Sequence, residues 1–295
     1  MKYALFLGCT IPARLKQYEY SSRAVLGKLG IELIDIKEFN CCGYPLENTD
    51  FKASILAASR NLALAERKGL NILVLCKCGF GMLKKAAHLI KEDLSLKKEI
   101  NAILLKEGLK CEGAIEVKHL LSVLYHDIGV DTIAEKITNP YNELKIATHY
   151  GCHALRPSDI VEFDDPVNPT LFDKLVEATG AQSVPWQARL ECCGAPVFGN
   201  NDDLSMDLTE KKLLSARESG ADFLCNACPY CHIQFDTVQR MIKNERQTDN
   251  HLLPPILYPQ LLGLSLGIKS DILGLEMNGI DIRAVSKFLQ APKES

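Results

Sequence analysis

Hydrophobic positions along the chain form short apolar runs that alternate with longer stretches of helical periodicity. Residues 17–30 (QYEYSSRAVLGKLG) and 51–69 (FKASILAASRNLALAERKG) repeat apolar residues every three or four positions, and each ends in a glycine, which predicts two helices. The apolar runs beside them have the length of buried strands. These expected strands cover residues 2–8 (KYALFLG), 31–37 (IELIDIK) and 71–75 (NILVL).

The same alternation returns after residue 140. Residues 144–151 (LKIATHYG) and 221–225 (ADFLC) are expected strands, and residues 169–180 and 205–220 are expected helices. Strands that alternate with helices usually pair in parallel, with helices covering both faces of the sheet. The pattern therefore predicts an α/β fold built from two parallel-sheet, Rossmann-like units in tandem, with added helices.

Residues 83–137 lie between the two units and carry further amphipathic helices, including 96–108 and 119–129. The sequence NPYNE then leads into the second unit. We therefore expect one domain over residues 1–140 and a second over residues 141–295. The apolar stretch LLPPILYPQLLGLSLGIKSDILGLEM near the C-terminus is expected to pack on the protein's own core, and a surface for a partner protein is the alternative.

Composition narrows the class of protein. The chain has 47% hydrophobic and 24% charged residues and a formal net charge of −3, which is typical of a soluble globular protein and gives no reason to expect nucleic-acid binding. No stretch approaches the roughly 20 apolar residues of a membrane span, and no signal peptide is recognisable. We expect a cytoplasmic protein, in which 12 cysteines indicate metal or redox chemistry rather than structural disulfides.

Two motifs place adjacent cysteines before a glycine. Cys41 and Cys42 are followed by Gly43 and Pro45 (FNCCGYP), and residues 191–197 (ECCGAPV) repeat these four types in order. Neighbouring Cα atoms lie about 3.8 Å apart, closer than the roughly 4.4 Å that ordinary disulfides need, so a bond within either pair would be strained. Adjacent side chains also point in different directions, which suits two atoms of one polynuclear metal centre.

The paired cysteines belong to two sets that repeat along the chain. The offsets between corresponding cysteines are 143, 151, 151 and 150 residues, which indicates a tandem duplication. Most of these cysteines follow an expected strand, at the carboxyl edge of the sheet where open α/β folds bind ligands. Each half is therefore expected to gather its own thiols at the rim of its own sheet. The first set is Cys9, Cys41, Cys42 and Cys78, and the second is Cys152, Cys192, Cys193, Cys228 and Cys231.

Iron–sulfur ligation explains the two sets better than zinc does. A structural zinc site closes with four ligands, whereas the second set offers five. Cysteine thiolates are the usual ligands of iron–sulfur clusters. The glycine behind each pair is expected to let the backbone approach the cluster sulfides and to leave N–H groups free to tune its potential. Zinc is the alternative.

In these motifs the chain resembles the B subunits of the heterodisulfide reductases, a family built from two CCG domains. Each domain of that family places a lone cysteine, then CC, then CxxC. The second half carries all three motifs, as GCHALRPS, ECCGAP and CPYCHIQFD, and the first half carries FLGCTIPARLKQYEYSSR and FNCCGYP. The resemblance continues to PPILYPQLLGLSLGI and so covers nearly the whole chain.

The resemblance implies a catalytic iron–sulfur subunit that reduces the disulfide of coenzyme M and coenzyme B, or a related small-molecule disulfide, to two thiols in one-electron steps. It implies a non-cubane 4Fe-4S cluster on the five cysteines of the second set, which are the expected catalytic residues together with His153. It also implies electron delivery by two further proteins of a heterodisulfide reductase complex, the flavin-bearing A subunit and the ferredoxin-like C subunit, in some complexes with a hydrogenase or a formate dehydrogenase.

The last motif of the first half, LCKCGFGML, departs from the family pattern. If Cys78 takes the first CxxC position, the second falls on Gly81, and if Cys76 takes it, the second falls on Gly79. We expect Cys78 to complete the first set, with Cys76 as the substitute. The first-half centre is then a 2Fe-2S cluster, an ordinary 4Fe-4S cluster or the non-cubane cluster, and an altered centre is expected to relay electrons.

Other polar residues lie near the cysteines in sequence. His149 and His232 neighbour second-set cysteines, and we expect structural roles for both. An anionic substrate needs cations, and three basic residues follow the lone cysteines, although exposed surface is the expected place for each. These residues are Arg14, Lys16 and Arg156. Cys111 and Cys225 lie outside the repeated sets and are expected to pack in the core.

Two other functions fit the same motifs. CCG domains also occur in iron–sulfur subunits of lactate, glycerol-phosphate and succinate or fumarate oxidoreductases, where the resemblance implies electron relay. A purely structural zinc scaffold is the non-enzymatic alternative.

Overall fold

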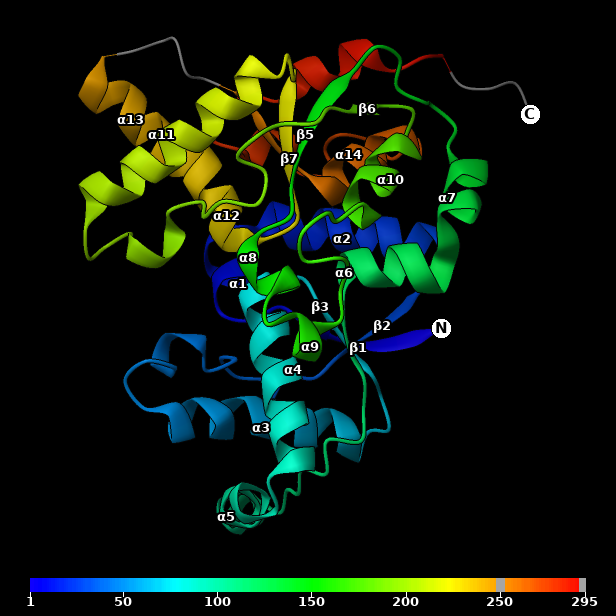
Figure 1. Ribbon diagram of the computed structural model, residues 1–295. Coiled ribbons are helices and arrows are strands. Elements are labelled where there is room, and N and C mark those ends of the chain that lie inside the picture. The colour runs from blue at the N-terminus through cyan, green and yellow to red at the C-terminus, as the bar shows by residue number, and fades with distance from the viewer. Residues whose placement is uncertain (248–252, 292–295) are drawn as a thin grey trace.

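The fold consists of two four-stranded parallel sheets, one from each half of the chain (Figure 1). The computed structural model describes residues 1–247 and 253–291. The first sheet has the order β2-β1-β3-β4 and the second has the corresponding order β6-β5-β7-β8. The strands are β1 (Lys2–Phe6), β2 (Glu32–Asp35), β3 (Ile72–Val74), β4 (Val117–His119), β5 (Lys145–His149), β6 (Gln182–Ser183), β7 (Phe223–Asn226) and β8 (Pro255–Leu257).

These sheets confirm the predicted α/β fold of two tandem parallel-sheet units. Each neighbouring pair of strands within them is parallel, with Lys2 opposite Glu32 in the first sheet and Lys145 opposite Gln182 in the second. Three strands were not expected from the sequence, namely β4, β6 and β8. Each has only two or three residues, which is too short to show a periodic pattern.

Helices of the first half cover its sheet. The α-helices are α1 (Thr10–Arg14), α2 (Lys16–Lys28), α3 (Phe51–Arg67), α4 (Lys77–Glu92), α5 (Leu94–Leu104), α6 (Leu120–Ser122) and α7 (Val130–Lys136). Two 3-10 helices, η1 (Tyr44–Leu46) and η2 (Leu105–Glu107), and one π-helix, η3 (Val123–Gly129), accompany them. The helices expected over 17–30, 51–69, 96–108 and 119–129 correspond, within one or two residues at most of their ends, to α2, α3, α5 with η2, and α6 with η3.

The second half repeats the arrangement. Its α-helices are α8 (Cys152–Leu155), α9 (Ser158–Val161), α10 (Leu171–Glu177), α11 (Asp202–Glu218), α12 (Pro229–Ile233), α13 (Gln239–Arg246) and α14 (Tyr258–Ser265). A π-helix, η5 (Gln234–Val238), joins α12 to α13. The 3-10 helices are η4 (Ala195–Val197), η6 (Leu275–Met277) and η7 (Arg283–Phe288).

The longest helix of each half begins and ends in the same way. Asp50 caps α3 by accepting a hydrogen bond from the N–H of Ala53 at 2.9 Å, and Asn201 caps α11 through the N–H of Leu204 at 3.0 Å. Each helix runs into a glycine with positive φ, as the sequence predicts. Both helices follow a CC motif, so the caps fix the position of the cysteine loops relative to the sheets.

The two halves pack against each other through helices that cross between them. Helix α14 from the C-terminal part packs on α2, and α4 packs on α8 and α9 (Figure 1). Residues of both halves form one large hydrophobic core. Every residue from Tyr258 to Leu266 is buried, which confirms that this part of the C-terminal stretch packs on the protein's own core. The domain boundary near residue 140 stays a prediction.

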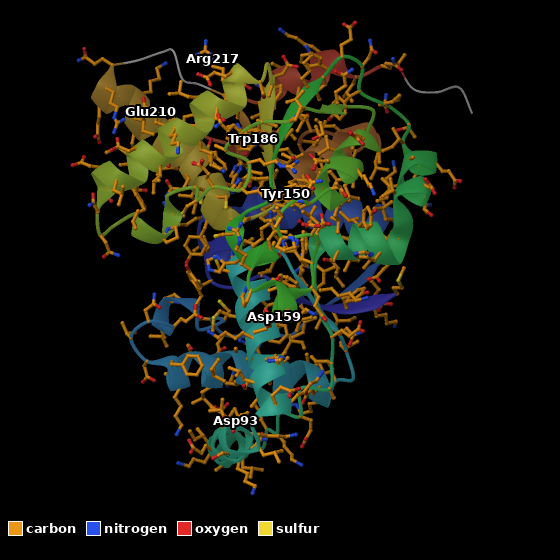
Figure 2. The ribbon with its side chains drawn as sticks, in the orientation of Figure 1. Asp93, Tyr150, Asp159, Trp186, Glu210 and Arg217 are labelled. Atoms are coloured by element: carbon orange, nitrogen blue, oxygen red, sulfur yellow. The ribbon has the colours of Figure 1, made fainter. Side chains whose placement is uncertain are left out.

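The interior and the surface are separated as expected for a globular fold. Tyr150 and Trp186 lie inside, whereas Glu210 and Arg217 lie on the outer helix α11 and Asp93 lies at the outer junction of α4 and α5 (Figure 2). Within residues 1–247 and 253–291, no helix combines the length and the apolar character that crossing a membrane requires.

Candidate metal centres

Most cysteines of the two sets line two neighbouring pockets at the carboxyl edges of the sheets. The first-half pocket follows β1 and β3, and the second-half pocket follows β5 and β7. This placement agrees with the ligand edge of parallel α/β sheets. The cysteines of the first-half pocket are Cys9, Cys42 and Cys76. Those of the second-half pocket are Cys78, Cys152, Cys193, Cys228 and Cys231.

Two tyrosines form the wall between the pockets. Tyr44 follows the first CCG motif, Tyr230 lies inside the second-half CxxC motif, and both line both pockets. Their ring centroids are 6.4 Å apart, and the ring of Tyr44 also lies edge-on to His153 at 4.9 Å. Sequence reasoning missed these residues, although their positions within the cysteine motifs were a usable signal. The two pockets therefore share a wall made of two neighbouring aromatic side chains.

Cys76 and Cys78 point to different pockets. Cys76 is the N-cap of α4 and Cys78 lies in its first turn. The backbone of Cys76 is extended (φ −99°, ψ 125°), so its side chain does not continue the helical rotation that directs Cys78. Cys76 lines the first-half pocket and Cys78 lines the second-half pocket. The sequence led us to expect Cys78 in the first set with Cys76 as its substitute, and which of the two binds the first-half centre stays a prediction. The two thiols still interact with each other and with Cys228.

The glycine of each CCG motif allows the backbone to approach a helix closely, and the expected approach to cluster sulfides stays a prediction. A Cβ on Gly43 would lie 2.4 Å from the carbonyl oxygen of Ser54 in α3, and one on Gly194 would lie 2.6 Å from that of Ser205 in α11. Both glycines have positive φ. The glycine therefore brings each loop against its helix. The Gly194 nitrogen also lies 3.4 Å from the Cys192 sulfur and donates to it, as expected for an N–H that tunes a cysteine ligand.

Each CC pair contains one acidic thiol. A hydrogen bond from the Cys42 thiol lowers the pKa of Cys41 to about 5, and Cys41 also interacts with Cys9. In the second half, a hydrogen bond from Cys192 lowers the pKa of Cys193 well below its usual value. Neighbouring thiols that share a proton favour one thiolate. Each loop can therefore offer a metal ligand at neutral pH.

His149 is a fully buried histidine beside Cys193 and Cys231 of the second-half site. Its ring nitrogens have no hydrogen-bond partner among the described residues. A nitrogen of His149 and the sulfurs of Cys193 and Cys231 all lie within 4.8 Å of one another. Burial lowers its pKa to about 4, so the ring is neutral at pH 7. This surrounding makes His149 a candidate donor to a metal centre, and the structural role expected from the sequence stays a prediction.

The other two histidines differ in their surroundings. The Nδ1 atom of His153 lies 3.4 Å from the Cys152 sulfur and 3.7 Å from that of Cys78. Burial lowers the pKa of His153, but the Cys152 thiol and other anionic groups outweigh it and raise the value overall. His232 instead pairs with Asn226 and Asn278 at 3.3 and 3.1 Å, which is the expected structural role.

The basic residues expected near an anionic substrate do not line either pocket. Arg14, Lys16 and Arg156 are all exposed. Cys111 and Cys225 are fully buried in the hydrophobic core, which agrees with their expected packing role. The cation that does line the second-half pocket is Lys77, from the middle of the CKC sequence, which sequence reasoning did not single out.

Comparison with known proteins follows the same division into halves. The cysteine-rich CCG domain matches residues 3–84 and, a second time, residues 146–236. The chain belongs to the CCG domain family. It is related to the B subunits of heterodisulfide reductases: it is 39% identical over 283 residues to the B subunit of the ferredoxin/F(420)H(2)-dependent CoB-CoM heterodisulfide reductase of Methanosarcina acetivorans, covering 95% of this chain and 94% of that one.

Other relatives of this CCG protein are named for different reactions. It is 35% identical over 282 residues to the 8-methylmenaquinol:fumarate reductase membrane anchor subunit of Wolinella succinogenes, covering 95% of this chain and 97% of that one. It is 24% identical to the lactate utilization protein A of Macrococcus caseolyticus, covering 80% and 88%. The resemblance to the B subunits of heterodisulfide reductases is confirmed. Because other relatives carry the names of different enzymes, membership of the CCG domain family does not by itself identify the reaction.

A solved structure shares the fold. The crystal structure of a hypothetical protein from Helicobacter pylori superposes with a TM-score of 0.77 at 18% sequence identity and covers 96% of this chain. The chain spans about half of that protein, 52% of its length. The similarity supports the two-unit α/β architecture.

The donor set fits iron–sulfur centres. Soft thiolate ligands gather in largely buried pockets, next to helix N-termini whose partial positive charge favours thiolates. His149 adds an orphaned nitrogen donor that an added group would satisfy. One His and two Cys within 4.8 Å would also suit zinc, so metal analysis distinguishes the two.

Proposed function

We propose that this CCG protein is the catalytic iron–sulfur subunit of a heterodisulfide reductase. It would reduce the disulfide of coenzyme M and coenzyme B, or a related disulfide, to two thiols. The overall change adds two electrons and two protons and breaks one S–S bond. The observation that carries the proposal is the second-half pocket, where five cysteines and His153 meet, in a chain whose relatives at 39% identity bear this activity in their names.

The second half would hold the catalytic centre. Cys152, Cys193, Cys228 and Cys231 line its pocket, and Cys192 adjoins Cys193 at the exposed rim. These five residues would hold a non-cubane 4Fe-4S cluster. Such a cluster supplies one electron at a time and a site for a substrate sulfur. Because Cys78 lines the same pocket, it is a sixth thiol within reach of that site.

His153 would supply a proton to a leaving thiolate. Its Nδ1 atom already lies within 3.4 Å of one sulfur and 3.7 Å of another, so sulfur atoms are its natural partners. Burial lowers its pKa, but the Cys152 thiol and other anionic groups outweigh that effect and raise it, which favours the protonated ring. An imidazole in this position is therefore suited to protonate a thiolate product.

The first half would hold the relay centre. Cys9, Cys41, Cys42 and either Cys76 or Cys78 are its candidate ligands, for a 2Fe-2S or a 4Fe-4S cluster. The pocket geometry favours Cys76, because Cys78 lines the other pocket. Electrons would arrive from the flavin-bearing A subunit through the ferredoxin-like C subunit, and the Tyr44–Tyr230 contact lies between the two pockets.

Anaerobic purification followed by a turnover assay tests the proposal. We expect iron and acid-labile sulfide in the protein, a paramagnetic signal on reduction, and cleavage of the coenzyme M and coenzyme B disulfide with reduced viologen. The matched control is Cys193→Ser, which should abolish turnover. Zinc without labile sulfide would refute the proposal, and so would an iron–sulfur protein that cleaves none of a panel of disulfides.

Electron relay to a quinone-linked oxidoreductase is the second candidate. It is favoured by the 35% identity to the fumarate reductase subunit, which also covers 95% of the chain. The same purified protein decides between them. Relay predicts reducible centres without disulfide turnover, and a stable association with a fumarate- or lactate-oxidoreductase partner.

A further inference from the structure

Three nitrogen-bearing side chains surround the second-half site in the interior of the protein. Lys77 and Lys212 are each 1% exposed, and His149 is 0% exposed. Lysine is almost never fully buried without a partner that compensates its charge. Within the described residues, neither lysine takes part in an ion pair. Their burial therefore calls for an anionic group close by.

Lys77 reaches from the first half into the second-half pocket. Its ammonium donates hydrogen bonds to the carbonyl oxygens of His149, at 3.2 Å, and of Tyr150. The same nitrogen lies 5.5 Å from the ring centroid of Phe172. The absence of a side chain at Gly151 makes space for Lys77, because a Cβ there would lie 3.0 Å from the Lys77 side chain. Carbonyls and a ring solvate this ammonium without neutralising it, so the charge acts on the adjacent cysteines.

Lys212 approaches the site from α11. Its ammonium donates to the carbonyl oxygens of Glu191, at 2.9 Å, and of Ala188, both in the loop that leads into the second CC motif. It also lies 4.8 Å from the ring centroid of Trp186. Burial lowers its pKa to about 8, and the nearby Cys193 thiolate counteracts that effect. The lysine thus ties the loop down and leaves its charge beside the cysteines.

Corresponding positions of the first half carry no such groups. His149 ends β5 as Phe6 ends β1, and Lys212 occupies the position in α11 that Asn61 occupies in α3. Asn61 performs the same tethering with a neutral amide, because it accepts from the Asn40 N–H at 2.9 Å and donates to the Cys41 carbonyl at 3.2 Å. Tethering therefore needs no charge, and the positive charge of Lys212 has a separate effect.

We propose that Lys77, Lys212 and His149 hold the second-half centre at a higher reduction potential than the first-half centre, so that an arriving electron settles next to the substrate. One-electron reduction adds one negative charge to the centre, and two buried ammonium groups stabilise that charge. The neutral imidazole of His149 donates its N–H to a thiolate or sulfide of the centre, which acts in the same direction. The inference rests on the proposed iron–sulfur function.

Redox titration of the purified, fully loaded protein, followed by electron paramagnetic resonance, tests this inference. Lys212→Met keeps the length of the side chain and removes the charge, Lys212→Arg keeps the charge, and Lys110→Met removes an exposed lysine elsewhere. We expect the second-half signal to shift to a more negative potential in Lys212→Met only. His149→Phe, which installs the first-half residue, should shift it in the same direction with iron content retained.

The possible results separate the inference from the proposed function. Equal second-half potentials in the protein and in Lys212→Met, at equal iron content, overturn the inference and leave the disulfide chemistry intact. Lys212→Met also removes the hydrogen bonds to the Ala188 and Glu191 carbonyls, so loss of iron in that variant reflects the lost tether as well as the lost charge. In that case Lys77→Met decides by the same titration: a more negative second-half potential supports the inference, and an unchanged potential overturns it. A protein that contains zinc and no labile sulfide refutes the proposed function instead.

Discussion

The two cysteine pockets share a scaffold and differ in the groups that face the metal site. In both halves a CCG loop with a left-handed glycine lies against a capped helix of 17 residues, and a parallel sheet presents the cysteines at its carboxyl edge. The differences lie at single positions. The second half has Cys231 where the first has Gly81, and it has His149 where the first has Phe6. Duplication therefore preserved the geometry that holds a metal centre, while substitutions at a few positions changed its ligands and its charge.

The largest expected effect tests whether the two pockets have different roles. Cys193→Ser should lower disulfide turnover with reduced viologen by at least roughly 100-fold, because it removes a ligand of the catalytic centre. Cys42→Ser removes the corresponding ligand of the relay centre, and viologen can still reduce the second centre directly. We expect it to retain more turnover while losing part of the iron. Equal losses in the two variants would contradict the division into relay and catalytic centres.

The repeated architecture was predictable because corresponding cysteines of the two halves are separated by nearly constant distances along the sequence. The strands that precede Cys9 and Cys152 and the helices that end at Gly69 and Gly220 all have clear periodicity. The three short edge strands gave no comparable signal. Interleaving of the halves was also not predictable, since packing of α14 on α2 depends on contacts between residues far apart in sequence.

Side-chain direction at the site was the harder problem. The CKC sequence predicts a ligand but not which cysteine faces which pocket, because that depends on the residue at which α4 begins. His149 and Lys77 are ordinary residues in the sequence, and only the fold shows that His149 is buried with unpartnered ring nitrogens and that Lys77 is buried with only neutral hydrogen-bond partners among the described residues. The composition of each half therefore predicted its chemistry, whereas the placement of single side chains required the three-dimensional fold.

The loop glycines Gly43 and Gly194 test whether the scaffold that the two halves share depends on the close contact between each CCG loop and its helix. Gly194→Ala places a Cβ 2.6 Å from the Ser205 carbonyl at a positive φ, so we expect a loss of about 3 kcal/mol in the free energy of unfolding. Gly43→Ala should lose a similar amount, because its contact with Ser54 is as close. The control is Gly220→Ala, which has positive φ but open space, and should lose about 1 kcal/mol. Chemical denaturation measures all three, and a Gly194→Ala protein as stable as the control would show that the loop can move away.

The contact between the halves can be tested by measuring how the free energy of unfolding depends on pH. His119 ends β4 of the first half and is fully buried, with Nε2 3.2 Å from the Ala227 carbonyl beside Cys228. Burial lowers its pKa to about 3, so the folded protein holds a neutral ring while the unfolded chain takes up a proton below pH ~6.5. The stabilisation is therefore present above that pH and is lost as the pH falls toward 3. We expect its contribution to fall by about 3 kcal/mol by pH 4.5.

Denaturation of the metal-free protein at several pH values measures this dependence. Other buried histidines titrate in the same range, so the matched variant is His119→Gln, which retains hydrogen-bonding groups and cannot take up the proton. Its stability should fall less steeply between pH 6.5 and 4.5. An identical slope in the two proteins would mean that His119 is accessible to protons in the folded state.

The assignment of Cys76 and Cys78 gives a smaller and more specific effect. Cys76→Ser should alter the spectrum of the first-half centre, because Cys76 lines that pocket with Cys9 and Cys42. Cys78→Ser should leave that spectrum and perturb the second-half centre, whose pocket Cys78 lines beside His153. Electron paramagnetic resonance of each variant, with iron counted per chain, separates the two. The opposite pattern would restore Cys78 as the first-half ligand and imply that metal binding turns the start of α4.

The smallest expected effect comes from restoring the missing CxxC cysteine. A Cβ on Gly81 would lie 3.2 Å from the carbonyl oxygen of His153, which is tight but can be relieved by a small shift of α8 against α4. If loss of this ligand is what distinguishes the first-half centre, Gly81→Cys should change that centre's spectrum or raise its iron content and should leave the second-half centre nearly unchanged. Gly81→Ser introduces the same crowding with a hard hydroxyl in place of a soft thiol. A change that appears in both variants would therefore reflect the displaced helix, and an unchanged spectrum and iron count in Gly81→Cys would show that the first-half centre differs from the second for reasons other than the missing cysteine.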